Sequence, residues 1–151
     1  LQKLGEKYAD PKALDLVYNT GLVESKYVYL KQIKGPAVGF AQIEPWVGIS
    51  MIQDYLQYRE KLMKKVADVC KIDWKYFIDP QEEDWRYILT VNIAAQIVFC
   101  RLHYWRVPKS LPRTFNGYLG LVTIPSLTRE SKLTVVPSSS SFKTDTLKRI
   151  E

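Results

Sequence analysis

Histidine and cysteine are scarce in this chain of 151 residues, which contains one histidine, His103, and two cysteines, Cys70 and Cys100. A single histidine excludes a His-rich zinc site and any mechanism that needs several histidines. The cysteines lack C-x-x-C spacing and both fall in helix-like sequence, so we expect buried free thiols rather than a disulfide. Carboxylates are left as the richest supply of titratable side chains, and we expect neither a metal nor a cofactor.

Long apolar runs are also missing. No run is long enough to span a bilayer, and no signal-peptide pattern begins at Leu1. The length fits one domain with a real core. The net charge of +6 favours a polyanionic partner such as nucleic acid, an anionic cell-wall polymer or lipid headgroups. The lysines and arginines are dispersed, however, and no basic recognition helix is present, which argues against a nucleic-acid binder.

The chain is organised around the stretch from Glu24 to Pro45, E-S-K-Y-V-Y-L-K-Q-I-K-G-P-A-V-G-F-A-Q-I-E-P. Its glycines and prolines, including Gly39, break it into a loop rather than one regular element. The loop is nevertheless apolar, and we expect burial of Ala37, Val38, Phe40, Ala41 and Ile43. An apolar loop that is held in place is a plausible wall for a site.

Asp10 and Pro11 predict the start of a helix, as a cap and a first helical residue. Apolar residues then recur on one face at Leu14, Val17, Tyr18 and Gly21, with Leu22 and Val23 beside them. Three residues further along this stripe lies Glu24. Burial and the negative end of the helix dipole would both raise the pKa of its carboxyl group. The alternative is an ordinary solvated glutamate at a fraying helix end.

Further helices are expected on both sides of residue 75. Pro45 opens two short ones that are separated near Tyr58 and end at about Cys70. A long helix begins at Asp79-Pro80 and ends at about Trp105. Its apolar face contains Asn92, whose amide must bond either the backbone of the glycine-bearing loop or a core carbonyl.

The composition changes beyond Pro108. An Asn-Gly turn precedes Tyr118, short extended segments follow at 119–124 and 133–136, and a serine-rich linker leads to a basic tail. We therefore divide the chain into a helical domain at 1–112 and an extended, partly β or irregular C-terminal arm at 113–151.

Three of these elements, in order, resemble the soluble lytic transglycosylase branch of the lysozyme superfamily, and in particular the short transglycosylase-like proteins of tailed bacteriophages. They are Glu24-Ser25 at a helix end, the loop Gly39-Phe40-Ala41-Gln42-Ile43-Glu44-Pro45, and Asn92-Ile93 followed by spaced apolar residues. The resemblance covers roughly residues 14–102 and implies a mainly α, lysozyme-like fold that cleaves the glycan strand of peptidoglycan.

The resemblance also implies roles for single residues. Glu24 would protonate the leaving oxygen and then take the proton of the sugar C6 hydroxyl, which gives an anhydro-sugar without a second carboxylate. Substrate-site residues carried over or placed beside the loop are Ser25, Tyr27, Gly39, Phe40, Gln42, Asn92 and Tyr118. Asn92 would support the loop from behind. Glu44, at a variable position of the motif, is interpreted as a structural or surface residue.

Two departures from the family pattern are visible. After Pro112 the chain offers only Asn116-Gly117-Tyr118 in place of the family's Ala-Tyr-Asn-type motif, and Gln96 replaces a small residue after Asn-Ile. Two functions therefore stay open. One is a virion-associated enzyme acting on peptidoglycan; the other is a non-catalytic phage structural protein that binds other virion proteins through the C-terminal arm. Both place the chain in the virion.

Overall fold

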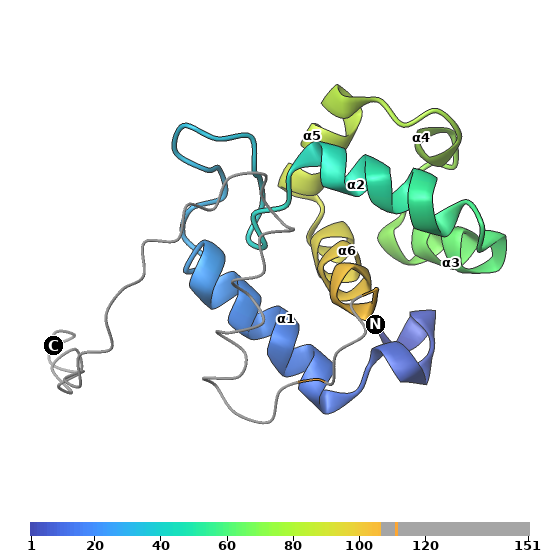
Figure 1. Ribbon diagram of the computed structural model, residues 1–151, viewed down its shortest axis with the longest axis horizontal. Helices are drawn as coiled ribbons and strands as arrows, with labels where there is room; N and C mark the ends of the chain where they lie inside the picture. The colour runs from blue at the N-terminus through green and yellow to red at the C-terminus, as the bar shows by residue number, and fades with distance from the viewer. Residues whose placement is uncertain (107–110, 112–151) are drawn as a thin grey trace, which may run out of the picture.

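Helices make up most of residues 1–106 and 111, the part of the chain that this computed structural model describes, and no β-strand is found there (Figure 1). The mainly helical prediction is confirmed. In chain order the elements are η1 (Gln2–Leu4), η2 (Glu6–Tyr8), α1 (Pro11–Glu24), α2 (Pro45–Met51), η3 (Ile52–Leu56), α3 (Glu60–Cys70), α4 (Lys75–Ile78), α5 (Glu82–Val91) and α6 (Ile93–Trp105).

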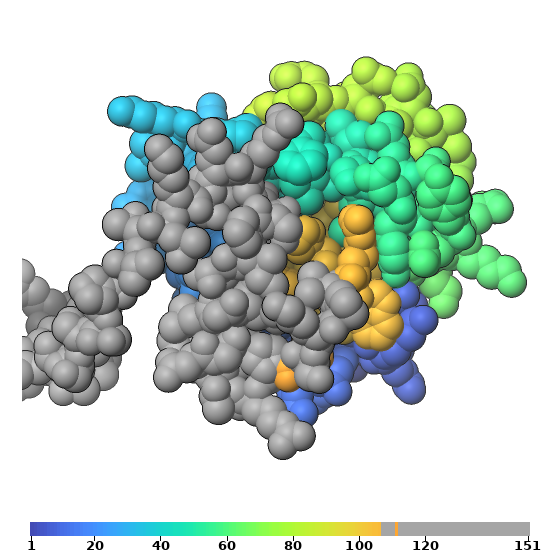
Figure 2. Space-filling model, viewed as in Figure 1, coloured from blue at the N-terminus to red at the C-terminus, as the bar shows by residue number. Residues whose placement is uncertain are grey.

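Helix α6 is the centre of the arrangement. It is apolar on several sides, and Ala95, Val98, Phe99, Cys100 and Leu102 are all buried. A helix of this kind needs neighbours around it. It packs against α1 on one side and against α2, α3 and α5 on the others (Figure 1). On the face shown in Figure 2, α2 and α3 form one continuous surface beside the orange α6.

The prediction of one long helix between Asp79 and Trp105 is wrong in two respects. It starts later, with Gln81 as the N-cap of α5, and it is broken at Asn92. Asn92 has an extended backbone, and its side-chain oxygen accepts a 2.9 Å hydrogen bond from the amide of Ala95. The residue therefore caps a new helix, because a short amide side chain competes well for backbone donors.

Helix α1 begins as predicted, with the Asp10 carboxylate accepting a 2.8 Å bond from the Lys12 amide. Its buried face is only partly the expected one: Val17 and Gly21 are buried, whereas Leu22 and Val23 are exposed. Leu14 and Tyr18 are 48% and 58% exposed. The buried residues are Ala13, Leu16, Val17, Thr20 and Gly21. Thr20 bonds Tyr104 of α6, while the space beside Gly21 is filled by the Tyr27 ring, which a Cβ there would meet at 2.3 Å. Glu24 still follows this buried face and is itself half-buried.

The remaining expectations for the helical region are largely confirmed. The chain breaks between η3, a π-helical turn, and α3 at residues 57–59, and α3 ends at Cys70. Both cysteines are buried and free. Burial raises the pKa of each thiol to about 12, so neither is reactive at neutral pH. The short helix α4 was not expected.

The predicted C-terminal arm, including Tyr118, lies outside the described residues, as do the two extended segments and the domain boundary at 112–113. Across residues 1–106 no helix has both the length and the apolar character that a membrane crossing requires.

Candidate functional site

The loop at 37–45 is buried along its whole length, as its apolar sequence predicts. Two isolated antiparallel bridges, Lys31 to Val38 and Val38 to Ile43, fold it back on itself. Gly39 and Gln42 both have positive φ, at 71° and 47°, which tightens the turn between them. The loop is therefore a defined wall rather than a surface connection.

A buried glutamine on α6 holds this loop from behind. Gln96 is 2% exposed. Its oxygen accepts a 3.1 Å bond from the Ala41 amide, and its nitrogen donates to the carbonyls of Val38, at 3.1 Å, and Leu89. A Cβ at Gly39 would lie 1.5 Å from Gln96 Nε2 and 2.6 Å from the Leu89 carbonyl oxygen. Only glycine fits between the loop and α6 at this position.

The support predicted for Asn92 thus comes from Gln96. The Asn92 amide donates a 2.8 Å bond to the carbonyl of Cys70, so the core-carbonyl alternative is the one observed, and the predicted contact of Asn92 with the loop is wrong. The sequence pattern marks Gln96 only as a departure from a small residue. The sequence could have indicated this role, because a polar residue inside an apolar helix needs buried hydrogen-bond partners.

Ser25 and Gln42 both bond the backbone around the loop. The Ser25 hydroxyl donates to the Gly21 carbonyl and accepts from the Tyr27 amide, both at 3.1 Å, which closes the end of α1. The Gln42 amide donates to the carbonyls of Tyr29, at 3.0 Å, and Gly39, at 2.8 Å. These polar residues join the loop to the turn that follows Glu24.

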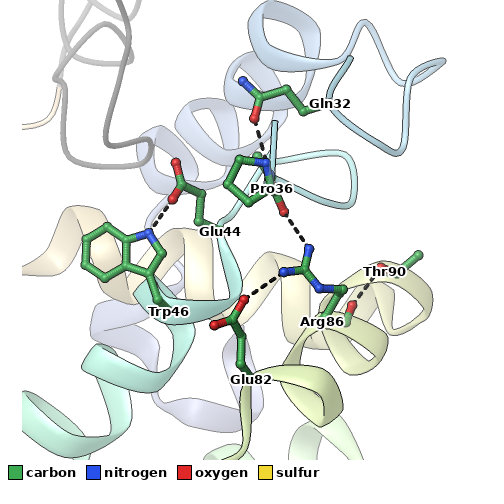
Figure 3. A network of polar contacts seen from close by, with 8 residues as sticks. Gln32, Pro36, Glu44, Trp46, Glu82, Arg86 and Thr90 are labelled. Atoms are coloured by element: carbon green, nitrogen blue, oxygen red, sulfur yellow. Dashed lines mark hydrogen bonds and ion pairs between the residues drawn. The ribbon is translucent and has the colours of Figure 1, made fainter. Parts of the chain in front are cut away.

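A second set of contacts fixes the two ends of the loop (Figure 3). Arg86 on α5 donates to the Pro36 carbonyl at 3.2 Å and pairs with Glu82 at 2.7 Å. At the other end Glu44 is buried and accepts a bond from the indole nitrogen of Trp46. Glu44 is therefore a structural residue of the loop and not a surface one.

Glu24 is the last residue of α1, where the negative end of the helix dipole disfavours a second negative charge. Its side chain lies toward α6. Burial is the main cause of the raised pKa values of Cys100 and Tyr104, and the charge of Glu24 raises both further. Desolvation raises the pKa of Glu24 itself from 4.5 to about 7. The predicted rise of its pKa is confirmed, and a sizeable share of this group is protonated at neutral pH.

Aromatic rings link the turn to the loop. Tyr27 stacks on Tyr18, with ring centroids 5.7 Å apart, and on Phe40, at 5.3 Å. The Tyr27 hydroxyl donates a 2.8 Å bond to the Tyr18 carbonyl. Two aromatic residues that the sequence places in the site are thus brought together, and Tyr18 joins them.

These rings border an apolar groove of about 730 Å³ between α1 and the α5–α6 junction. Its lining includes Leu14, Tyr18, Tyr27, Leu30, Gly39, Phe40, Val91, Ile93 and Gln96. Three of the predicted site residues, Tyr27, Gly39 and Phe40, therefore share one groove. Glu24, Ser25 and Gln42 do not line it.

Residues 1–106 contain no cluster of three or more His, Cys, Asp or Glu side chains arranged to hold a metal ion. Comparison of the chain with protein-family models, with curated proteins and with solved structures gives no match.

Proposed function

We propose that the chain is a murein lytic transglycosylase of a phage virion, with a lysozyme-like fold, that cleaves the glycan strand of peptidoglycan with Glu24 as its single acid and base. The observation that supports this best is the state of Glu24. It is a half-buried carboxyl group with a pKa of about 7, and Tyr27 and Tyr29 of the turn that follows it contact the apolar loop. The order of the Glu-Ser, Gly-x-x-Gln and Asn-Ile elements in the sequence supports the same reaction.

The chemistry requires one group to act in both directions. The protonated Glu24 donates its proton to the glycosidic oxygen as the bond from that oxygen to C1 breaks. The resulting carboxylate then takes the proton of the C6 hydroxyl group while the C6 oxygen bonds to C1. This forms the anhydro-sugar and restores the acid. No water is consumed. A pKa near 7 suits both halves of the cycle, because the acid and its conjugate base are similarly stable there.

Replacing Glu24 by glutamine tests the proposal. Glu24→Gln keeps the shape of the side chain but removes its proton chemistry, so we expect release of anhydro-sugar fragments from purified sacculi to fall by at least about 100-fold. The products are measured by mass spectrometry. Glu83→Gln, which changes an exposed carboxylate on α5, is the matched control and should leave the rate unchanged. Full activity in Glu24→Gln would refute the assignment.

The pH profile gives a second readout. Because the first step needs the protonated acid, activity should decline as the pH rises above about 7. An enzyme that gains activity steadily up to about pH 9 would contradict a general acid with this pKa.

A non-catalytic role as a phage structural protein is the second candidate. It is favoured by the exposed apolar residues on α1 and at the α5–α6 junction, such as Leu14, Tyr18 and Ile93, which are 48%, 58% and 70% exposed. These three residues line one groove, and exposed apolar side chains that gather in one place are typical of contacts between proteins. This role would place the chain against other virion proteins, also through residues 113–151. Stable incorporation into particles by a protein that never clears a peptidoglycan zymogram would favour this candidate over the enzyme.

A further inference from the structure

Basic residues that are dispersed in the sequence gather around one groove of about 610 Å³. It lies where η2, the turn before α3 and the end of α6 meet, and Lys7, Tyr55, Arg59, Lys61 and Trp105 line it. The groove adjoins the residues that precede α1, whereas Glu24 ends that helix about 20 Å away. The two sites are therefore separate, and binding at this groove does not depend on the proposed cleavage.

Two aromatic rings of the groove lining, Tyr55 and Trp105, each hold two cations, of which Arg59 and Lys7 line the groove themselves. The guanidinium of Arg59 lies 4.0 Å and that of Arg106 5.7 Å from the centre of the Tyr55 ring. The Trp105 ring has Arg101 at 4.9 Å and the Lys7 ammonium at 5.7 Å. Cations over a ring face are attracted by its quadrupole and lose freedom of movement. The rings thus fix the positive charges in place.

Within the described residues, Lys7, Arg59, Lys61 and Arg106 form no ion pair with a carboxylate, whereas the buried Arg101 is influenced by the charge of Asp10. The ion pairs found there are Lys64–Glu60, Lys71–Asp68 and Arg86–Glu82. Glu60 is the acid of the groove lining, and Lys64 already pairs with it.

The helix dipole adds to this imbalance. Arg59 and Lys61 lie at the N-terminal end of α3, the end at which the dipole disfavours positive charge. A local concentration of cations in this setting attracts anions and is stabilised by them.

We propose that this groove binds the phosphodiester backbone of a linear polyol phosphate, the chemistry of anionic cell-wall polymers. Phosphate oxygens would accept bonds from the lining residues Arg59, Lys61 and Lys7, and the short saturated linkers between phosphates would lie on Leu62 and on the edges of the rings. Spaced cations suit a chain of repeating phosphates better than a single small anion.

The covered ring faces favour a polyol over a nucleic acid. Single-stranded nucleic acid is bound without sequence preference by basic grooves that also stack bases on open aromatic faces. Here the Tyr55 and Trp105 rings both carry cations over their faces. A ligand that needs only phosphate contacts therefore fits the groove without displacing them.

The test measures binding of a synthetic glycerol-phosphate oligomer to the full chain by titration calorimetry at low salt. The variant Arg59→Gln/Lys61→Gln removes two exposed groove cations, and Lys31→Gln/Lys34→Gln removes the same charge from exposed positions beyond the other end of α1. We expect the groove variant to bind about tenfold or more weakly. Its plot of log affinity against log salt should also lose roughly two units of slope. The control variant should bind within about twofold of the unchanged protein, since distant exposed charges are screened.

Three outcomes would overturn the inference. Equal losses in the two variants would show that net charge alone attracts the oligomer. Equally tight binding of polyglutamate of the same charge would show that phosphate is not recognised. Tighter binding of an oligodeoxynucleotide with the same number of phosphates would assign the groove to nucleic acid instead. Sacculus cleavage is not measured in this experiment, so its result is independent of the role of Glu24.

Discussion

The loop at 37–45 and the C-terminal end of α1 meet at the proposed site, and they are stabilised in opposite ways. The loop is buried, and its backbone polar groups are bonded by Gln96 and Gln42. The end of α1 carries a half-buried carboxyl group whose charged form is disfavoured by desolvation. The difference indicates that the loop contributes rigidity, while the helix end holds a group in an environment that costs stability. Buried groups with perturbed pKa values are typical of catalytic and other functional sites.

The rigidity of the loop at 37–45 is tested most strongly at Gly39. In Gly39→Ala the new methyl group meets Gln96 and the Leu89 carbonyl at a backbone φ of 71°, so we expect a loss of at least about 3 kcal/mol in the free energy of unfolding. Denaturant titration measures it. Gly35→Ala is the milder comparison, because its φ is not positive and its methyl group meets only the Gln32 side chain, which would have to give up its 3.2 Å bond from the Ala37 amide. Similar small losses in both variants would show that the loop is not held as described.

The destabilising environment of Glu24 at the end of α1 is tested by the pH dependence of stability in Glu24→Gln. The folded-state pKa of Glu24, about 7, exceeds its ordinary 4.5, so the folded state keeps a proton that the unfolded chain has lost between these pH values. This contribution to stability is complete below pH 4.5 and is lost as the pH rises through 7. We therefore expect Glu24→Gln to gain about 2 kcal/mol relative to the unchanged protein between about pH 4.5 and 8.

Taking the difference between the two proteins removes the contribution of His103, which has the opposite sign. Burial, aided by Arg106, lowers the His103 pKa from 6.5 to about 4, so its contribution is lost as the pH falls through that window. A stability difference between Glu24→Gln and the unchanged protein that does not vary with pH would contradict the raised pKa of Glu24.

A smaller effect is expected where the two helices meet behind Glu24. The hydroxyl groups of Thr20 on α1 and Tyr104 on α6 share a 3.1 Å hydrogen bond, and both residues are buried. Tyr104→Phe removes this bond and should cost about 1 kcal/mol in thermal or denaturant unfolding. A loss as large as that of Gly39→Ala would mean that the helix end is as tightly specified as the loop.

Much of this arrangement can be predicted from sequence, and the failures have physical causes. The Asp10-Pro11 start, the burial of the loop and the raised pKa of Glu24 follow from local rules for caps, apolar loops and helix ends. The interruption at Asn92 could not be predicted in this way. The apolar pattern continues on both sides of Asn92, so it does not indicate that this side chain caps a new helix. The buried face of α1 was predicted only in part. Val17 and Gly21 are buried as expected, but Leu14 and Tyr18 are exposed, and Thr20 is buried with its hydroxyl bonded to Leu16 and Tyr104, which a hydrophobic pattern does not register.

The support of the loop by Gln96 was missed for a related reason. Its partners, Ala41 and Val38, lie more than fifty residues away, and no periodic pattern connects them. Long-range pairing of buried polar groups depends on how α6 meets the loop, which only the three-dimensional arrangement reveals.

The ionisation of Glu24 itself is the most direct test of the account. Titration of its side-chain carboxyl carbon by NMR, assigned by comparison with Glu24→Gln, should give a midpoint near pH 7 in the folded protein. A midpoint near 4.5, the ordinary value for a glutamate, would show that the carboxylate is solvated and would contradict its role as the acid.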